Sequence, residues 1–169
     1  MIEAMIDIET LDTKNSAVVF QIGLVIFKGQ QVLQKKQWNL MVDQQLARGR
    51  TVSASTLAFH LGIPANLMNA INKEDDIYCG GVAINQLKDE IASYEIKNFW
   101  AKGSFDFNIL DSLLSDYNEV VPWKFYQLRE LRTLMSECKV PKGDVSHNAL
   151  EDCIAQIEQL QKCRFLIGS

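Results

Sequence analysis

The stretch MIDIET, residues 5–10, places two acidic residues in a segment that otherwise reads as a buried β-strand. Side chains alternate between the two faces of a strand, so Asp7 and Glu9 lie on the same face as Met5. Neighbouring carboxylates repel each other and resist burial, which favours a strand end that opens to a bound cation. The alternative is that the strand ends at Ile8 and that Glu9 belongs to a solvated loop.

The segments after this strand predict a layered α/β domain. A hairpin is expected over residues 17–27 and 31–40, and helical patterns alternate with short strands from about residue 53. Helices are expected over residues 55–62, 64–72, 81–94, 104–117, 128–138 and 148–166, and strands over residues 2–8, 97–101 and 123–128. A sheet followed by alternating helices and strands is typical of the α/β class.

Length and composition indicate a single globular domain. The chain has 169 residues, of which 47% are hydrophobic and 22% are charged, and it contains no apolar run long enough for a membrane span. The N-terminus lacks the pattern of an export signal, so we expect the cytoplasm. The net charge of −4 argues against a protein that coats nucleic acid, although an enzyme could still bind one strand end. The four cysteines lack zinc-site spacing, so reduced thiols are expected.

Asp106 is the third acid that stands out. A helical wheel puts it within the apolar arc of the helix expected over residues 104–117. An acid in the first turn of a helix can also serve as a cap, because the helix dipole favours negative charge there. The wheel by itself leaves both roles open.

The start of the last helix, SHNALEDC at residues 146–153, carries two more acids. Asp152 and Glu151 fall on opposite edges of the apolar arc, so periodicity does not choose between them. Asn148 followed by Glu151 resembles a capping box, which gives Glu151 a local role and leaves Asp152 available. His147 is then expected in the loop just before the helix.

Three motifs, DIET at 7–10, GSFDFNIL at 103–110 and HNALED at 147–152, occur in this order over almost the whole chain. Together they resemble the three motifs of the DnaQ-like, or DEDDh, 3′-to-5′ exonucleases. RTL at 132–134 and TLAFHL at 56–61 are similar to a small branch of that superfamily, which includes the mycobacterial-type exoribonuclease and phage or prophage exodeoxyribonuclease VIII-like proteins.

The resemblance implies the RNase H-like fold, with a mixed five-stranded sheet, one strand antiparallel, flanked by helices in a single exonuclease domain over residues 1–169. It also implies hydrolysis of phosphodiester bonds at the 3′ end of single-stranded DNA or RNA, with release of nucleoside 5′-monophosphates. His147 would act as general base. Two Mg²⁺ or Mn²⁺ ions would be held by the four carboxylates of Asp7, Glu9, Asp106 and Asp152.

The same resemblance points to substrate contacts. Thr10 and Leu11 would meet the terminal nucleotide, although ordinary packing is an equal alternative for Leu11. Phe59 could stack on a base, whereas the helical pattern favours a core position for it. The expected partners are single-stranded DNA or RNA 3′ ends and no membrane, and a homodimer is left open.

Two other functions stay open at this point. One is a catalytically idle nuclease fold that serves as an interaction module for nucleic acid or protein. The intact set of five motif residues argues against it, because an idle copy would be free to lose an acid. The other is a globular domain whose acids are helix caps and surface charges.

Overall fold

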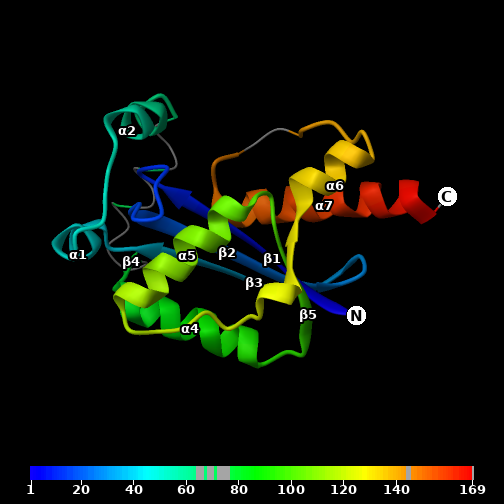
Figure 1. Ribbon diagram of the computed structural model, residues 1–169, viewed down its shortest axis with the longest axis horizontal. Helices are drawn as coiled ribbons and strands as arrows, with labels where there is room; N and C mark the ends of the chain where they lie inside the picture. The colour runs from blue at the N-terminus through cyan, green and yellow to red at the C-terminus, as the bar shows by residue number, and fades with distance from the viewer. Residues whose placement is uncertain (64–66, 68–70, 72–76, 144–145, 169) are drawn as a thin grey trace.

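The computed structural model describes residues 1–63, 67, 71, 77–143 and 146–168 (Figure 1). Strands and helices alternate after an N-terminal meander of three strands. The strands are β1 (Ile2–Thr10), β2 (Val19–Lys28), β3 (Gln31–Leu40), β4 (Ile77–Tyr78), β5 (Ile96–Ala101) and β6 (Leu128–Glu130). The helices are α1 (Val42–Ala47), α2 (Ala54–Leu61), α4 (Gly80–Ala92), α5 (Ser104–Asp116), the 3₁₀ helix η2 (Phe125–Gln127), α6 (Leu131–Glu137) and α7 (Ala149–Gly168).

The strands of the described residues form one mixed sheet in the order β4-β3-β2-β1-β5-β6. β2 pairs antiparallel with both β1 and β3, while the pairs β1–β5, β3–β4 and β5–β6 are parallel. The prediction of a mixed sheet with one antiparallel strand is therefore confirmed. The expected number of five strands is wrong, because the two-residue strand β4 adds a sixth at the edge, and such a short strand has no detectable alternation.

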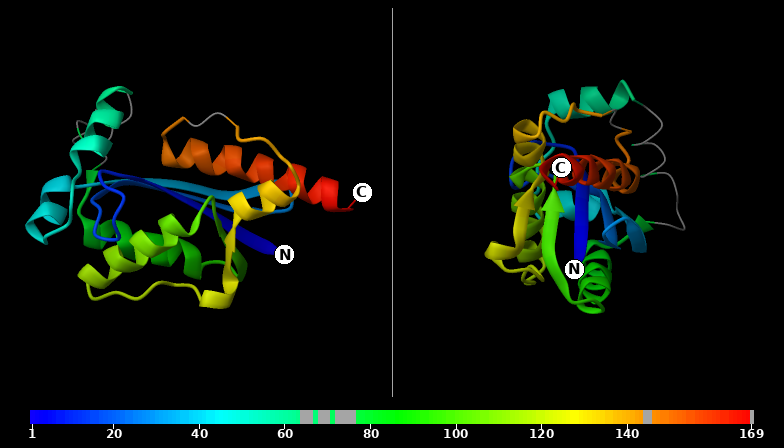
Figure 2. Two further views of the ribbon diagram at one scale, coloured as in Figure 1. Left: turned by 45° about the horizontal axis from the view of Figure 1, so that its top comes forward. Right: turned by 90° about the vertical axis from the view of Figure 1, so that its right-hand side faces the viewer.

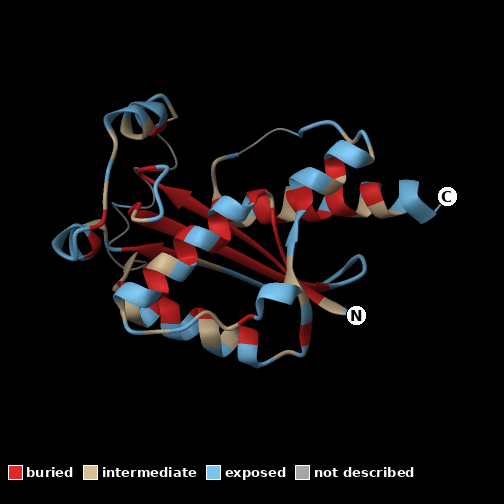
Figure 3. Cartoon of the chain, in the orientation of Figure 1, coloured by how far each residue is buried: buried red, intermediate tan, exposed pale blue. Residues whose placement is uncertain are grey.

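Helices cover both faces of the sheet, so an apolar layer lies on each side of it (Figures 1 and 2). Side chains that alternate along β1 contribute to both layers. Ile6 and Ile8 belong to the core under α4 and α5. Met5 faces the other way and packs with residues of α6 and α7. β1 and β2 are consequently buried almost throughout their length, as the red strands in Figure 3 show. Both faces of the central sheet are thus buried against helices.

The element boundaries correct several sequence predictions. β1 continues to Thr10, so the strand does not end at Ile8 and Glu9 is not in a solvated loop. The strand expected over 123–128 is wrong, since a 3₁₀ helix precedes a three-residue strand there. The helix expected over 64–72 falls largely outside the described residues.

The longer predicted helices are found close to their expected positions. The apolar arc of α5 is buried, as its spacing predicted, and includes Phe107, Leu110 and Leu114. Ser53 is the N-cap of α2, and its hydroxyl accepts a hydrogen bond from the Thr56 amide at 3.2 Å. Among the described helices none has the length and apolar character of a membrane span.

Candidate active site

The acidic end of β1 meets the first turn of α7. Asp7 and Glu9 lie on the face of the sheet covered by α7, and Asp152 reaches them from that helix. Carboxylate oxygens of these three residues lie within 4.8 Å of one another, and all three residues are buried. Carboxylate oxygens are the ligands preferred by Mg²⁺ and Mn²⁺, so the donor set fits a hard divalent cation.

The structure shows which of the two acids at the start of α7, Glu151 or Asp152, faces the site. Glu151 is exposed, and its amide donates to Asn148 Oδ1 at 3.1 Å, which is the expected helix cap. Asp152 is buried, and its Oδ1 accepts from the amide of Ser146 at 2.8 Å and from its hydroxyl at 2.9 Å. Ser146 therefore fixes the orientation of the Asp152 carboxylate and leaves its second oxygen for another ligand.

Asp106 lies in the first turn of α5 and lines the same cavity as the other three acids. The N-cap residue is Gly103, and the Asp106 carboxylate, three residues further on, also bonds the backbone at this end of the helix. Burial raises the pKa of Asp106 to about 6, opposed by hydrogen bonds with the backbone of Asp106 itself, Ile8 and Gly103 and by the charge of Arg132. The fourth acid of the predicted set thus joins the same site.

The electrostatics of the site disfavour four ionised carboxylates without a cation. Burial raises the pKa of Asp7 well above its usual range, and the charges on Asp106 and Glu9 raise it further. Burial and the charges on Asp152 and Asp106 raise the pKa of Glu9 from about 4.5 to about 8. A divalent cation bound among these oxygens would reverse the effect, because it stabilises the ionised form of each acid.

Gln156 supports Asp7 and was not identified from the sequence. It lies on the inner face of α7, one turn beyond Asp152, and its Nε2 donates to Asp7 Oδ1 at 2.6 Å. This bond favours the ionised carboxylate and so opposes the other influences on the pKa of Asp7. Gln156 Oε1 is buried and has no hydrogen-bond partner among the described residues. The sequence signal that could have identified Gln156 is a polar residue on the apolar side of the helix, one turn after the candidate ligand Asp152.

The start of α7 is held against β2 by two residues that the motifs do not include. Gly23 pairs with Asp7 across the sheet, and a Cβ atom placed on it would lie 2.4 Å from the backbone carbon of Ala149. Gln21 Oε1 accepts a hydrogen bond from the Ala149 amide at 2.7 Å. This close approach brings Asp152 to Asp7, which sequence periodicity could not show.

His147 precedes α7 and lines the acidic cavity. Its backbone has φ of 56°, in the left-handed region that non-glycine residues rarely adopt. Backbone outliers of this kind cluster at functional sites. Its ring packs edge-on against Phe59, with 4.9 Å between ring centroids. The structure therefore places the predicted general base beside the acids and next to the candidate stacking residue.

Two cavities meet at the acids. The larger one has a volume of about 770 Å³ and is lined by all five motif residues. The smaller one, of about 360 Å³, lies toward α2, and Thr10 and Phe59 line it. Ile8, Glu9 and Phe105 line both. The predicted catalytic residues and two of the three predicted substrate contacts thus line two adjoining cavities, which we together call the cleft.

Phe59 is 49% exposed, so the core position favoured by the helical pattern is wrong. His60, the next residue, fills the inner position of α2 instead and forms a 2.9 Å hydrogen bond from its Nε2 to the backbone oxygen of Thr10. The Thr10 hydroxyl donates to the backbone oxygen of Asp12 at 2.8 Å. These contacts fix the end of β1 beside α2, and the Phe59 ring lines the smaller cavity.

Leu11 lies apart from the cleft. It is 5% exposed and packs in a small core cluster with Val18 and Phe20. It also lines a different cavity, next to Leu40 and Val42. The structure thus corresponds to the packing alternative for Leu11, and a substrate contact for this residue stays a prediction.

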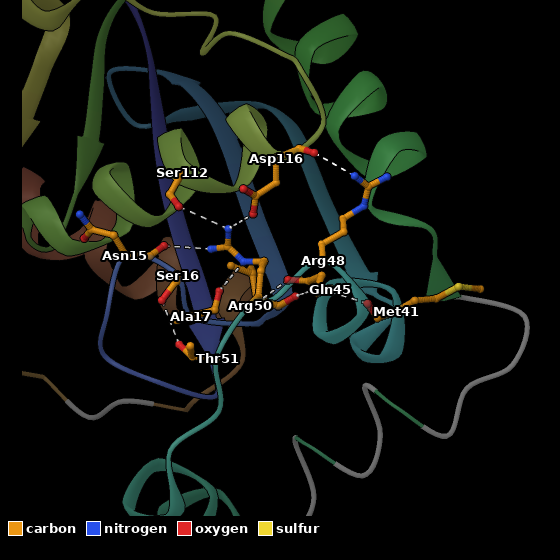
Figure 4. A network of polar contacts seen from close by, with 11 residues as sticks. Asn15, Ser16, Ala17, Met41, Gln45, Arg48, Arg50, Thr51, Ser112 and Asp116 are labelled. Atoms are coloured by element: carbon orange, nitrogen blue, oxygen red, sulfur yellow. Dashed lines mark hydrogen bonds and ion pairs between the residues drawn. The ribbon is translucent and has the colours of Figure 1, made fainter.

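A second buried charge holds the segment after Thr10 in place. Arg50 donates to the backbone oxygens of Ala17 at 2.7 Å and Asn15 at 3.0 Å, and to Asp116 Oδ2 at 2.6 Å (Figure 4). It ties this segment to the carboxyl end of α5, whose amino end carries Asp106. The Arg50 charge is matched by an ion pair with Asp116, whereas the acids of the cleft form no ion pair in the part of the chain that the structure describes.

A family model described as the 3′-5′ exoribonuclease Rv2179c-like domain matches residues 2–164. The chain belongs to this family. The family description agrees with the resemblance to 3′-to-5′ exonucleases that the three motifs carry. A comparison with curated proteins finds no match.

Two solved structures share the fold of this family member. One is the crystal structure of cell-death related nuclease 4 (CRN-4), with a TM-score of 0.64 and 13% identity over 98% of this chain and 64% of that one. The other is a full-length 3′-exonuclease, with a TM-score of 0.61 and 12% identity over 99% of this chain and 82% of that one. This chain thus spans less than two thirds of the length of CRN-4. At such low identity the likeness shows a common fold.

Proposed function

We propose that this protein removes nucleotides from the 3′ end of single-stranded nucleic acid, with two divalent cations held by Asp7, Glu9, Asp106 and Asp152. The observation that supports this most directly is the cluster of buried carboxylates with no ion pair among the described residues. Burying such a cluster is costly unless a cation compensates it. We further propose that residues 1–169 act as a single exonuclease domain.

The donor set fits Mg²⁺ or Mn²⁺, since it offers oxygen ligands and none of the four free cysteines lines the larger cavity. Two such ions, when bound, activate a water molecule and stabilise charge on the leaving oxygen. Gln156 and Ser146 hold Asp7 and Asp152 in fixed orientations for this task. Preorganised ligands avoid the cost of rearranging them during the reaction.

His147 is the proposed general base. It lines the cleft beside the acids, where an imidazole nitrogen can accept the proton of the attacking water. Contact with the Phe59 ring restrains the imidazole on one side. The position just before α7 means that the helix that supplies Asp152 also places His147.

The smaller cavity is the proposed site for the terminal nucleoside. Thr10 and Phe59 line it, and the exposed Phe59 ring offers a face on which any base can stack. Its volume of about 360 Å³ is at the lower end for small-ligand sites, which suits one nucleoside. The family description names RNA as the substrate, and we propose RNA as the first substrate to test for this chain.

The test uses 5′-labelled single-stranded RNA and DNA of one sequence, incubated with the purified protein and Mg²⁺, Mn²⁺ or chelator. We expect a ladder of 5′-labelled fragments that shorten one nucleotide at a time, together with nucleoside 5′-monophosphates. Asp106→Ala should abolish the ladder, while Asp111→Ala, an exposed acid of the same helix, should not. His147→Asn is preferred to His147→Ala, because asparagine tolerates the left-handed backbone better.

Full activity in chelator or in Asp106→Ala would refute the two-metal site. Full activity of His147→Asn would refute the general base. Cleavage inside the strand, or release of label from the 5′ end, would refute the direction. Comparing initial rates on RNA and DNA then decides the sugar preference.

A further inference from the structure

The larger cavity continues past the acids to a wall that carries positive charge. Lys102 follows the end of β5, Arg132 is in the first turn of α6, and Lys142 lies between α6 and α7. Arg132 and Lys142 are exposed and Lys102 is half-buried. The backbone joins two of these positions, because the Arg132 amide donates to the Lys102 oxygen at 3.0 Å. We call these three residues the cationic wall.

The cationic wall forms no ion pair within the described part of the protein, although the charge of Arg132 also acts on Asp106. Arg50, Lys88 and Arg164 each form an ion pair with a carboxylate, but no member of the cationic wall does so among the described residues. The carboxylate of Glu130, beside Gly103 near Arg132, accepts a hydrogen bond from the Thr133 hydroxyl. The four acids of the same cavity would be compensated by the proposed metal ions, which leaves the three cations to attract an anion in a chain of net charge −4.

The smaller cavity has the opposite character. Its described lining contains no lysine or arginine and consists largely of hydroxyls and rings, such as Thr56 and Phe59. In Figures 1 and 2, α2 and α6, which border the two cavities, lie on opposite sides of the acidic end of β1. The cleft is therefore asymmetric, with an uncharged compartment on one side of the acids and the cationic wall on the other.

This asymmetry matches the charge distribution of a strand end. The terminal nucleoside beyond the scissile phosphate carries no further phosphate, whereas every nucleotide on the other side of that bond adds one negative charge. The remainder of the strand therefore has to leave the acids across the cavity that contains Lys102, Arg132 and Lys142. Arginine and lysine are the side chains that most often bind backbone phosphates.

We propose that Lys102, Arg132 and Lys142 bind backbone phosphates of the nucleotides that precede the scissile bond. The enzyme then acts better on an oligonucleotide than on a dinucleotide, because only the longer strand reaches the cationic wall. This inference rests on the proposed exonuclease function and adds the path of the strand to it. Contacts with phosphates are independent of base sequence, so the longer strand gains affinity whatever its composition.

The test compares the wild type with Arg132→Ala/Lys142→Ala and with a control, Lys28→Ala/Lys35→Ala. The control removes the same charge from exposed positions of the β2–β3 hairpin. kcat/KM is measured on a dinucleotide and an octanucleotide that share the same 3′ end, over a range of KCl concentrations. Fluorescence anisotropy with the labelled octanucleotide, in chelator, gives binding without hydrolysis.

For the wild type and the control we expect a preference for the octanucleotide that weakens as salt increases. Arg132→Ala/Lys142→Ala should lose most of this preference, with an increase in KM larger than the decrease in kcat. Its slope of log affinity against log salt should be smaller by about 1.4, or about 0.7 for each lost phosphate contact with a single strand. A length preference and a salt slope equal to those of the control would overturn the inference.

The two proposals fail in different ways. A wild type that binds the octanucleotide through the cationic wall but hydrolyses neither substrate would refute the exonuclease function alone. A wild type that hydrolyses both substrates equally well would refute the path of the strand alone. Circular dichroism spectra of both double variants exclude unfolding as the cause of a loss.

Discussion

Buried carboxylates lie at both ends of β1, but among the described residues only the one at the amino end forms an ion pair. Glu3, Asp7 and Glu9 are on the same face of one strand, and all are buried. Glu3 accepts hydrogen bonds from Trp100 Nε1 at 2.7 Å and from Arg164 Nη2 at 2.5 Å. At the other end Asp7 and Glu9 face further carboxylates and no arginine or lysine ion pair among the described residues.

This difference separates a structural acid from a functional one. The charge of Glu3 is neutralised by Arg164, which lies near the end of α7, so it needs no ligand. Among the described side chains, the one that donates a hydrogen bond to Asp7 is the uncharged amide of Gln156, which leaves the charge of Asp7 for a ligand to neutralise. Burial alone does not identify a site, because Glu3 is as buried as Asp7. The absence of an internal counter-charge identifies it.

The largest expected effect comes from Asp7→Asn. Loss of one charged ligand should lower kcat by about 10³-fold, which corresponds to several kcal/mol of lost transition-state stabilisation. In chelator the same variant should melt about 3 °C higher than the wild type, because a buried and repelled carboxylate is gone. Rate assays with Mn²⁺ check the decrease in kcat, and thermal melts in chelator check the increase in melting temperature. A lower melting temperature in chelator would show that Asp7 is structural, as Glu3 is.

Gly23→Ala should have the next largest effect, although Gly23 carries no functional group. Its added Cβ would overlap the backbone of Ala149 and push the start of α7 from the sheet. A displacement of about 1 Å at the ligands can cost about 10²-fold in rate. Steady-state kinetics check this, with Gly81→Ala as the control, since a Cβ there makes only ordinary contact with Tyr117. Equal rates for the two variants would contradict this role of Gly23.

Glu3→Ala should affect stability and spare activity. It leaves the buried Trp100 Nε1 without its acceptor and Arg164 without its counter-charge, which should lower the free energy of unfolding by about 2 kcal/mol. The rate at a temperature where the variant is folded should stay within about twofold of the wild type. Chemical denaturation and the nuclease assay give the two readings. A large loss of activity in the folded variant would show that Glu3 is not a purely structural acid.

The smallest perturbation is a change of pH, which should alter the stability of the unsubstituted protein. Glu9 has a folded-state pKa of about 8 and an unfolded value near 4.5, so the folded state favours the protonated acid. Its contribution to stability is fully present below pH 4.5 and is lost as the pH rises to about 8. In chelator the melting temperature should therefore fall by several degrees over this interval. Saturating Mg²⁺ should remove most of the fall, and a profile unchanged by Mg²⁺ would argue against a cation at the acids.

Local patterns predicted a large part of the site. The two-residue period of a strand put Asp7 and Glu9 on one face, and the helical period put Asp106 toward the core, as the structure has them. The same local information could not choose between Glu151 and Asp152. It also favoured a core position for Phe59, because a wheel gives the spacing of apolar residues and not the neighbours that cover them.

The sequence by itself determined the longer elements, the fold class and the family, because strand and helix periods and the three motifs are properties of short segments. Only the tertiary structure decided which acids lack a counter-charge. Arg164 neutralises Glu3 from 161 positions away, and Gly23 admits α7 to the acidic end of β1. Such contacts depend on how distant segments pack together, and the periodicity of a short segment does not predict that packing.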